Sequence, residues 1–164
     1  MATRQKKPLE KALYEPMQRY LQSAFSAKFG NCHLEITAGG VFSPDLRGAV
    51  RHDIVFAFLG KKASPDLVGF LRGKYGVDDY IVVEVKRATV TLQDVYQVKM
   101  YGDLFSARYA LLLSPEPVPE EIKRLHKNVF ILHRFMSGWQ VSIGQWDESS
   151  KDVITDSWFP QSPF

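Results

Sequence analysis

The pattern of hydrophobic positions separates stretches of helical period from stretches of extended period. Between residues 8 and 29, apolar side chains recur every three or four positions, which predicts an amphipathic helix with Pro16 inside it. A second helix is predicted after Thr91, where Asp94 three residues later indicates a capping box. Apolar residues surround most of this second helix, so we expect it to be largely covered. A short third helix is predicted over residues 119–127.

Short apolar runs bounded by turn residues predict the strands. They cover residues 33–37, 50–59, 66–72, 80–86, 109–113, 129–135 and 139–146. The two runs that flank the turn at residues 73–79 are expected to pair as a hairpin. Strands come first as a meander and then alternate with helices, which predicts an α/β fold with a central mixed β-sheet flanked by helices.

Composition narrows the class of protein. The 164 residues fit a single domain over 1–164, with a core from about 9 to 146 and a polar and aromatic tail over 147–164. The net charge of +3 permits binding to a polyanion without requiring it. The single cysteine, Cys32, excludes an internal disulfide and a multi-cysteine zinc site. No apolar run is long enough to span a membrane and none follows the basic N-terminus, so we expect a cytoplasmic protein without a membrane partner.

The strand predicted over residues 80–86 carries two opposite charges among apolar neighbours. Side chains alternate along a strand, so Glu84 and Lys86 project to the same face. A charge in an apolar layer is costly without a partner, and an ion pair between these two residues is one solution. A metal ion is the other, because the hairpin brings Asp66 near Glu84 and two adjacent carboxylates repel each other unless a cation lies between them. Carboxylate oxygens suit Mg²⁺ or Mn²⁺.

Short motifs on consecutive elements point to a known family. Pro65-Asp66 on one strand and Glu84-Val85-Lys86 on the next resemble the motif of the PD-(D/E)xK nuclease superfamily. On the following helix, Gln97 and Tyr101 are similar to the QxxxY motif of one branch of that superfamily, and their spacing puts them on one helix face. The resemblance covers roughly residues 9–113 and implies a restriction-endonuclease-like fold.

The resemblance also implies a reaction, the hydrolysis of DNA phosphodiester bonds by water with the help of Mg²⁺ or Mn²⁺. RNA stays open as a substrate, and small domains of this kind often act as homodimers. Asp66, Glu84 and the backbone carbonyl of Val85 would bind the metal ion. Lys86 would orient or help deprotonate the water and stabilise negative charge on the phosphate.

Other members of the implied site come from helices. Gln97 would help to position the site, and Tyr101 would pack against it or contact a phosphate. Many members of the superfamily carry a further glutamate on the first helix. Glu10 is our choice for that role because it lies beside the apolar stripe of the predicted helix, and Glu15 is the reserve.

Two alternatives remain from the sequence. Asp53, inside a predicted strand, competes with Asp66 for the metal ion, whereas Asp45 also follows a proline but lies in a loop. The second alternative concerns function: the chain is a nucleic-acid-binding module that keeps the fold without cutting, or a structural partner that uses its aromatic tail. The set of Asp66, Glu84 and Lys86 argues against the binding module, because a non-catalytic scaffold does not need adjacent carboxylates.

Overall fold

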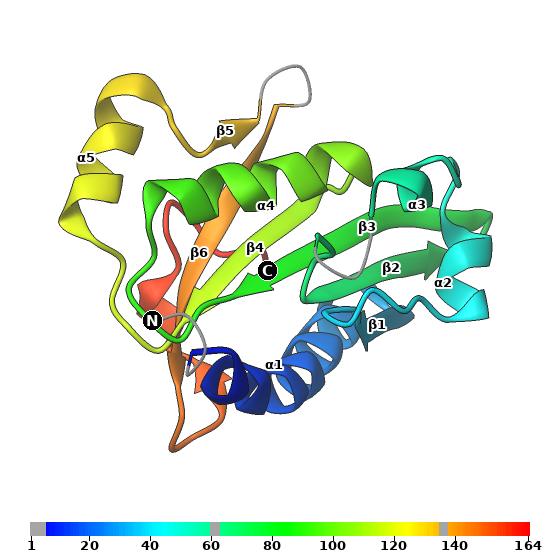
Figure 1. Cartoon of the computed structure of the whole chain (residues 1–164), viewed down its shortest axis with the longest axis horizontal. Helices are drawn as coiled ribbons and strands as arrows, with labels where there is room; N and C mark the ends of the chain where they lie inside the picture. The colour runs from blue at the N-terminus through cyan, green and yellow to red at the C-terminus, as the bar shows by residue number, and fades with distance from the viewer. Residues whose placement is uncertain (1–5, 60–62, 135–137) are drawn as a thin grey trace.

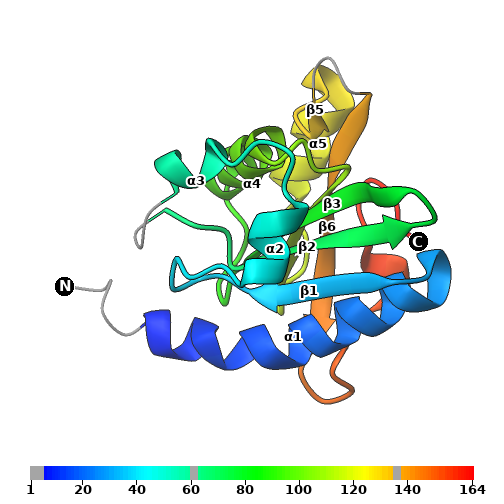
Figure 2. The ribbon, with the colours of Figure 1, turned by 90° about the vertical axis from the view of Figure 1, so that its right-hand side faces the viewer.

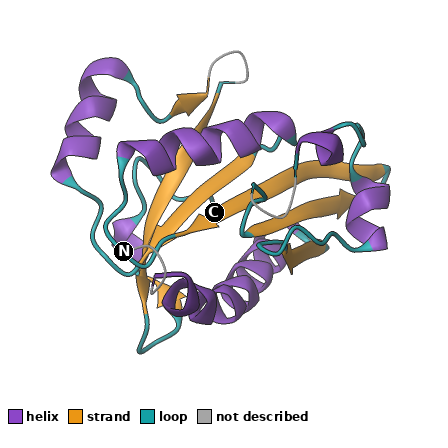
Figure 3. Ribbon diagram, in the orientation of Figure 1, coloured by secondary structure: helices purple, strands orange, loops and turns teal. Residues whose placement is uncertain are grey.

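Helices cover both faces of a mixed β-sheet in the computed structural model, which describes residues 6–59, 63–134 and 138–164 (Figures 1 and 3). Within these residues the sheet has seven strands in the order β1-β2-β3-β4-β6-β5, with β7 paired to β6. The strands are β1 (Cys32–Ile36), β2 (Leu67–Gly73), β3 (Gly76–Val85), β4 (Tyr109–Ser114), β5 (His133–Arg134), β6 (Trp139–Asp147) and β7 (Asp152–Val153). The predicted central mixed sheet flanked by helices is therefore confirmed.

The helices divide the hydrophobic core into two layers. They are α1 (Lys6–Phe29), α2 (Pro44–Ala49), α3 (Val55–Phe58), α4 (Leu92–Leu104) and α5 (Glu120–Val129), with a 3₁₀ turn at Thr155–Ser157. One buried cluster lies between the sheet and α1, and the other lies between the opposite face and α2 to α5 (Figure 2). Among the described residues, no helix combines the length and the apolar character that a membrane span needs.

Two predicted strands are wrong in whole or in part. Residues 50–59 form a turn and α3, because the buried side chains of Val55 and Leu59 are four residues apart, a helical spacing rather than an alternation. In the predicted strand over residues 129–135, α5 continues to Val129 and only His133–Arg134 pairs with β6. Phe135 lies outside the described residues.

Helix α4 is less covered than its apolar composition predicts. The exposed fractions are 40% for Leu92, 54% for Tyr96, 48% for Met100 and 36% for Leu104. These residues recur every fourth position and form a stripe on the outer side of the helix. The capping box is present as predicted, since the Thr91 hydroxyl accepts from the Asp94 N–H and the Asp94 carboxylate accepts from the Thr91 N–H.

The last residues of the chain fold back onto the sheet. Strand β7 pairs antiparallel with β6, and an isolated bridge joins Ile143 to Phe159. Val153 is buried, while Trp158 and Phe164 pack against the α1-side cluster. The core therefore extends past residue 146, the boundary expected from the sequence.

A bulge in the β2–β3 hairpin sets which residues face each other. The cross-strand pairs are Gly73 with Gly76, Arg72 with Val77 and, past the irregularity, Leu71 with Asp79. Asp78 is thus an extra residue on β3. The register at the turn, if continued, would pair Asp66 with Val83 and turn its side chain away from Glu84. The bulge shifts the register by one residue, so Asp66 comes opposite Glu84 on the same face.

Strands β1 and β2 approach each other so closely at Gly69 that a side chain does not fit. A Cβ atom there would lie 2.2 Å from the His33 carbonyl oxygen and 2.9 Å from the Leu34 Cα atom. We expect Gly69→Ala to lower the free energy of unfolding by about 1–3 kcal/mol, the usual range for overpacking, in urea denaturation. Gly48→Ala is the control, because it has open space in α2 and should be neutral or slightly stabilising. Equal losses at both positions would contradict the close approach.

Candidate active site

Asp66 and Glu84 lie side by side where the β2–β3 hairpin ends. The Asp66 N–H donates a hydrogen bond to Glu84 Oε1 (3.3 Å), and the Val85 N–H donates to Asp66 Oδ2 (2.8 Å). Glu84 is 2% exposed, and Asp66 is half-buried. The hairpin therefore brings the two carboxylates together, as the sequence predicted.

The backbone that carries Asp66 is fixed by the end of β1. Thr37 is fully buried, and its N–H donates to the Asp66 carbonyl oxygen (2.8 Å). Its hydroxyl donates to the Pro65 carbonyl oxygen (2.6 Å), and the Ser64 hydroxyl donates to the Thr37 carbonyl oxygen (2.6 Å). These bonds hold Pro65 and Asp66 in place before β2 begins. Sequence reasoning missed Thr37, since nothing local links it to a residue 29 positions later.

Burial perturbs both carboxylates in the same direction. It is the largest influence on Glu84, and with the negative charge of Asp66 it raises the pKa of Glu84 to about 9. Burial also raises the pKa of Asp66, to about 6, although hydrogen bonds from Val85 and Tyr14 act in the opposite direction. Glu84 therefore holds a proton at neutral pH when no cation is bound. Such a pair provides a place for a cation to replace that proton.

Lys86 follows β3 and forms an ion pair with a residue on the next helix. Its Nζ atom lies 3.4 Å from Asp94 Oδ1, and its side chain is 26% exposed. Partial burial lowers the pKa of Lys86, but Asp94 and then Glu84 raise it, and the net effect is a pKa above the ordinary value. Lys86 is therefore a cation at neutral pH. Asp94, predicted only as a helix cap, holds the ammonium group to the start of α4 as well.

Helix α4 places the Tyr101 hydroxyl near the carboxylates and Gln97 beside that hydroxyl. Gln97 Nε2 donates a hydrogen bond to the Tyr101 hydroxyl (3.4 Å), as their spacing of four residues allows. Burial raises the pKa of Tyr101, and the negative charges of Glu84 and Asp66 raise it further. The Tyr101 hydroxyl thus lies within the electric field of the site. Its ring is almost fully buried, so it also contributes to the core as packing alone would predict.

Helix α1 supplies two further residues from the other side. The Tyr14 hydroxyl donates a hydrogen bond to the Asp66 carboxylate, and burial together with that carboxylate raises the pKa of Tyr14. Glu10 lies one turn earlier on the same helix face. Burial and the nearer groups have larger effects, but the negative charge of Glu10 also raises the pKa of Asp66 and the pKa of Glu84. Sequence reasoning selected Glu10 but missed Tyr14, although its position four residues after Glu10 is a usable signal.

The two reserve residues lie away from this cluster. Asp53 is exposed in the turn before α3, because residues 50–54 do not form the strand that would have placed it in the sheet. Glu15 forms an ion pair with Arg19, and both side chains are exposed. Of the three aspartates considered for the metal ion, the structure thus places Asp66 beside Glu84, and not Asp53. Asp45 lies in the first turn of α2 and not in the expected loop.

The donor set fits a hard divalent cation with few protein ligands. In the part of the chain that the structure describes, no three or more His, Cys, Asp or Glu side chains are grouped to hold a metal ion. Mg²⁺ does not need such a group, because it keeps several waters and takes only one or two protein carboxylates. Asp66 and Glu84 would hold it, with the carbonyl of Val85 beside them as the further ligand that the resemblance implies. Glu10 adds negative charge nearby.

Tyr14→Phe tests the contribution of α1 to this site. The variant removes the hydrogen bond that favours the ionised form of Asp66, so protons compete better with a metal ion. We expect Mn²⁺ affinity, measured by titration calorimetry at neutral pH, to fall by roughly tenfold, as for other groups that orient metal ligands. Tyr20→Phe is the matched control, because the Tyr20 hydroxyl bonds with the backbone of Val153 instead. Unchanged affinity in both variants would show that Tyr14 does not act on the site.

Comparison with protein-family models, with curated proteins and with solved structures finds no match for this chain. The interpretation of the site accordingly depends on its own geometry. A buried and a half-buried carboxylate, one ammonium group and two tyrosine hydroxyls gather where the carboxyl end of β3 meets the start of β2. A cluster of this kind can hold a cation and an anionic ligand together.

Proposed function

We propose that this chain is a Mg²⁺- or Mn²⁺-dependent nuclease with a restriction-endonuclease-like fold, which hydrolyses phosphodiester bonds in DNA. One observation carries the proposal. At the end of a hairpin the Asp66 N–H donates to Glu84 Oε1 and the Val85 N–H donates to Asp66 Oδ2, and the Lys86 ammonium follows Glu84 two residues later. A buried acidic pair followed by a cation would be an unfavourable arrangement in a scaffold without a ligand for it.

The position of the cluster in the sheet supports the same function. Strands β3, β4 and β6 run parallel, and the site lies at the carboxyl end of β3. In open α/β sheets, ligands generally bind outside the carboxyl ends of the strands. The site thus lies where backbone geometry favours a ligand, rather than in the middle of a packed layer.

Each residue has a task that follows from its contacts. A divalent cation held by Asp66 and Glu84 would supply Lewis acidity and lower the pKa of its bound water. Lys86 acts as a cation that binds and neutralises the phosphate, since its raised pKa leaves little neutral amine to serve as a base. Tyr14 holds Asp66, and Asp94 holds Lys86. Gln97 and Tyr101, the pair joined on α4, close the site from that helix.

A cleavage assay with matched aspartate variants tests the proposal. Supercoiled plasmid, linear duplex, single-stranded DNA and single-stranded RNA are incubated with the protein in Mg²⁺, in Mn²⁺ or in EDTA. We expect cleavage only with a divalent cation, and its loss in Asp66→Asn. Asp45→Asn is the control, because Asp45 also follows a proline but is exposed in the first turn of α2.

The outcomes separate the candidate functions. Cleavage that survives in Asp66→Asn, or that is equally lost in Asp45→Asn, would remove the basis for the proposed site. DNA binding without cleavage, unchanged in Asp66→Asn, would instead identify a non-catalytic nucleic-acid-binding module. Cleavage of RNA and not of DNA under the same conditions would correct the substrate but keep the chemistry.

A further inference from the structure

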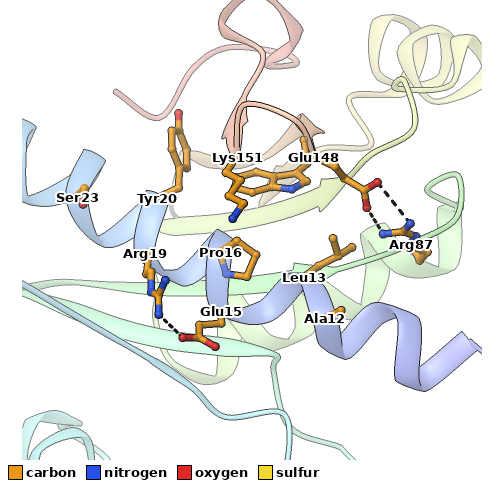
Figure 4. Close-up of a pocket in the computed structure, with 11 residues that line it drawn as sticks. Ala12, Leu13, Glu15, Pro16, Arg19, Tyr20, Ser23, Arg87, Glu148 and Lys151 are labelled. Carbon is orange, nitrogen blue, oxygen red and sulfur yellow. Dashed lines mark hydrogen bonds and ion pairs between the residues drawn. The ribbon is translucent and has the colours of Figure 1, made fainter.

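A wide groove runs between α1 and the hairpin of β6 and β7. Its volume is about 890 Å³. Figure 4 shows Ala12, Leu13 and Arg87 toward one end and Tyr20 and Ser23 toward the other, with Lys151 across from Pro16. The remaining lining residues are Glu15, Arg19, Trp146 and Glu148. The groove is therefore formed by α1, the segment after β3 and the turn between β6 and β7.

The groove meets the candidate active site at the end of β3. Arg87 lines the groove, and Lys86, the residue before it, forms part of the site. The two residues are consecutive in the chain, so the groove and the site adjoin at the end of β3. On α1, Glu10 and Tyr14 face the site from one flank, whereas Pro16 and Arg19 line the groove on the other.

The arginines of the groove form exposed ion pairs with glutamates, and an anionic ligand can replace those glutamates. Three cations, Arg19, Arg87 and Lys151, lie among two carboxylates. Arg87 pairs with Glu148, and their side chains are 38% and 46% exposed. Exposed pairs of this kind contribute little to stability. A phosphate offers a guanidinium the same bidentate geometry as a carboxylate, so it can replace Glu148 on Arg87 at little cost.

Apolar and aromatic groups line the same groove. Pro16 and the half-buried ring of Tyr20 come from α1. Trp146 is only 2% exposed, and it supports the Tyr20 ring edge to face with centroids 5.8 Å apart. Proteins that bind single-stranded nucleic acid combine cations along the backbone with aromatic groups on which bases stack. The bases of a duplex are already stacked on each other, so an aromatic lining favours a single strand.

We propose that this groove binds a single strand of DNA that extends from the active site past Arg87 toward Tyr20. The proposal rests on the proposed function, because the strand is the substrate of the nuclease. The groove follows α1 from Leu13 to Ser23, which is about 15 Å at the helical rise. Successive nucleotides of a stacked strand rise about 3.4 Å along its axis, so this length accommodates roughly four nucleotides. In the absence of a bound strand, Glu148 forms an ion pair with Arg87.

Binding is tested apart from cleavage by fluorescence anisotropy in EDTA, with a labelled oligothymidylate of about twelve nucleotides. Arg87→Gln and Lys151→Gln are each expected to weaken binding several-fold and to reduce the slope of log K against log salt by about 0.7. Glu148→Gln is expected to tighten binding about three- to tenfold, since it frees Arg87. A misfolded variant cannot produce such a gain.

Matched variants on α5 control for net charge. Lys123 and Glu120 form another exposed ion pair, away from the groove. Lys123→Gln and Glu120→Gln should each change affinity by less than about twofold. Shifts as large as those in the groove would overturn the proposal, as would tighter binding of a duplex or of oligouridylate of the same length. If the groove variants change the affinity for the single strand but the protein cleaves no DNA, the proposed nuclease activity is wrong and the binding groove stands. If the protein cleaves DNA but the groove variants leave affinity unchanged, the proposed groove is wrong and the nuclease activity stands.

Discussion

Glu84→Gln is expected to abolish cleavage and to stabilise the metal-free protein at alkaline pH. Glutamine keeps the shape of the side chain and an oxygen that can accept from the Asp66 N–H. It cannot provide the negative charge that a divalent cation needs, so cleavage should fall by about three orders of magnitude or more. The same change removes a buried ionisable group, which the folded protein tolerates only in its protonated form.

The pH dependence of stability follows from the direction of the shift. The pKa of Glu84 is raised from 4.5 to about 9 in the folded protein, so between these values the folded state binds more protons than the unfolded state. The free energy of unfolding of the metal-free wild type therefore decreases as pH rises through this window. The raised pKa of Asp66 contributes in the same direction between 3.8 and about 6.

Urea denaturation in EDTA at pH 5.5 and pH 8.5 measures the effect. The wild type should lose stability between the two pH values, and Glu84→Gln should lose less, with a gain over the wild type on the order of a few kcal/mol at pH 8.5. Mg²⁺ or Mn²⁺ should restore the wild type and leave the variant unchanged. Glu120→Gln, an exposed position, is the control. A wild type that is more stable at pH 8.5 without metal would contradict the buried acidic pair.

Lys86→Gln is expected to separate metal binding from catalysis. Its ammonium group is not a metal ligand, so affinity for Mn²⁺ should remain within about threefold of the wild type. Cleavage should fall by about 10²- to 10³-fold, the usual loss when a group that stabilises charge in the transition state is removed. Calorimetry and a single-turnover cleavage assay on the same preparation measure the two quantities.

Asp94→Asn tests whether the ion pair at the start of α4 positions that ammonium group. Asparagine can still accept from the Thr91 N–H and cap the helix, but it no longer pairs with Lys86. We expect an intermediate loss of cleavage, about tenfold, with metal binding retained. Thr91→Ala is the matched control, because it weakens the cap and leaves the ion pair intact.

If Lys86→Gln loses metal binding together with cleavage, the role of Lys86 as a phosphate-binding cation that does not bind the metal is wrong.

The sequence identified most of the site because its signals are local. Glu84 and Lys86 stand out by alternation in one strand, Gln97 and Tyr101 by their spacing in one helix, and Thr91 with Asp94 by a capping pattern. Each of these patterns depends on residues at most four positions apart, where the period of the backbone alone fixes which side chains share a face.

Long-range contacts account for what the sequence did not reveal. Thr37, at the end of β1, donates a hydrogen bond to the backbone of Asp66, and Tyr14 of α1 donates one to its carboxylate. The strand expected around Asp53 fails because Val55 and Leu59 bury a helical face against the core. The sequence did not predict the exposed apolar stripe on α4 for a similar reason, because apolar composition does not tell which side of a helix the sheet covers.

The sequence by itself determined the three longest helices, the central mixed sheet and the identity of the acidic and basic residues. Only the tertiary structure decided that Asp66 and Glu84 share a face. That choice depends on Asp78, the extra residue that shifts the β2–β3 register after the turn. A slip of one residue turns every side chain of a strand to the other face, and the packing of both sheet faces, not the local sequence, selects between the two registers.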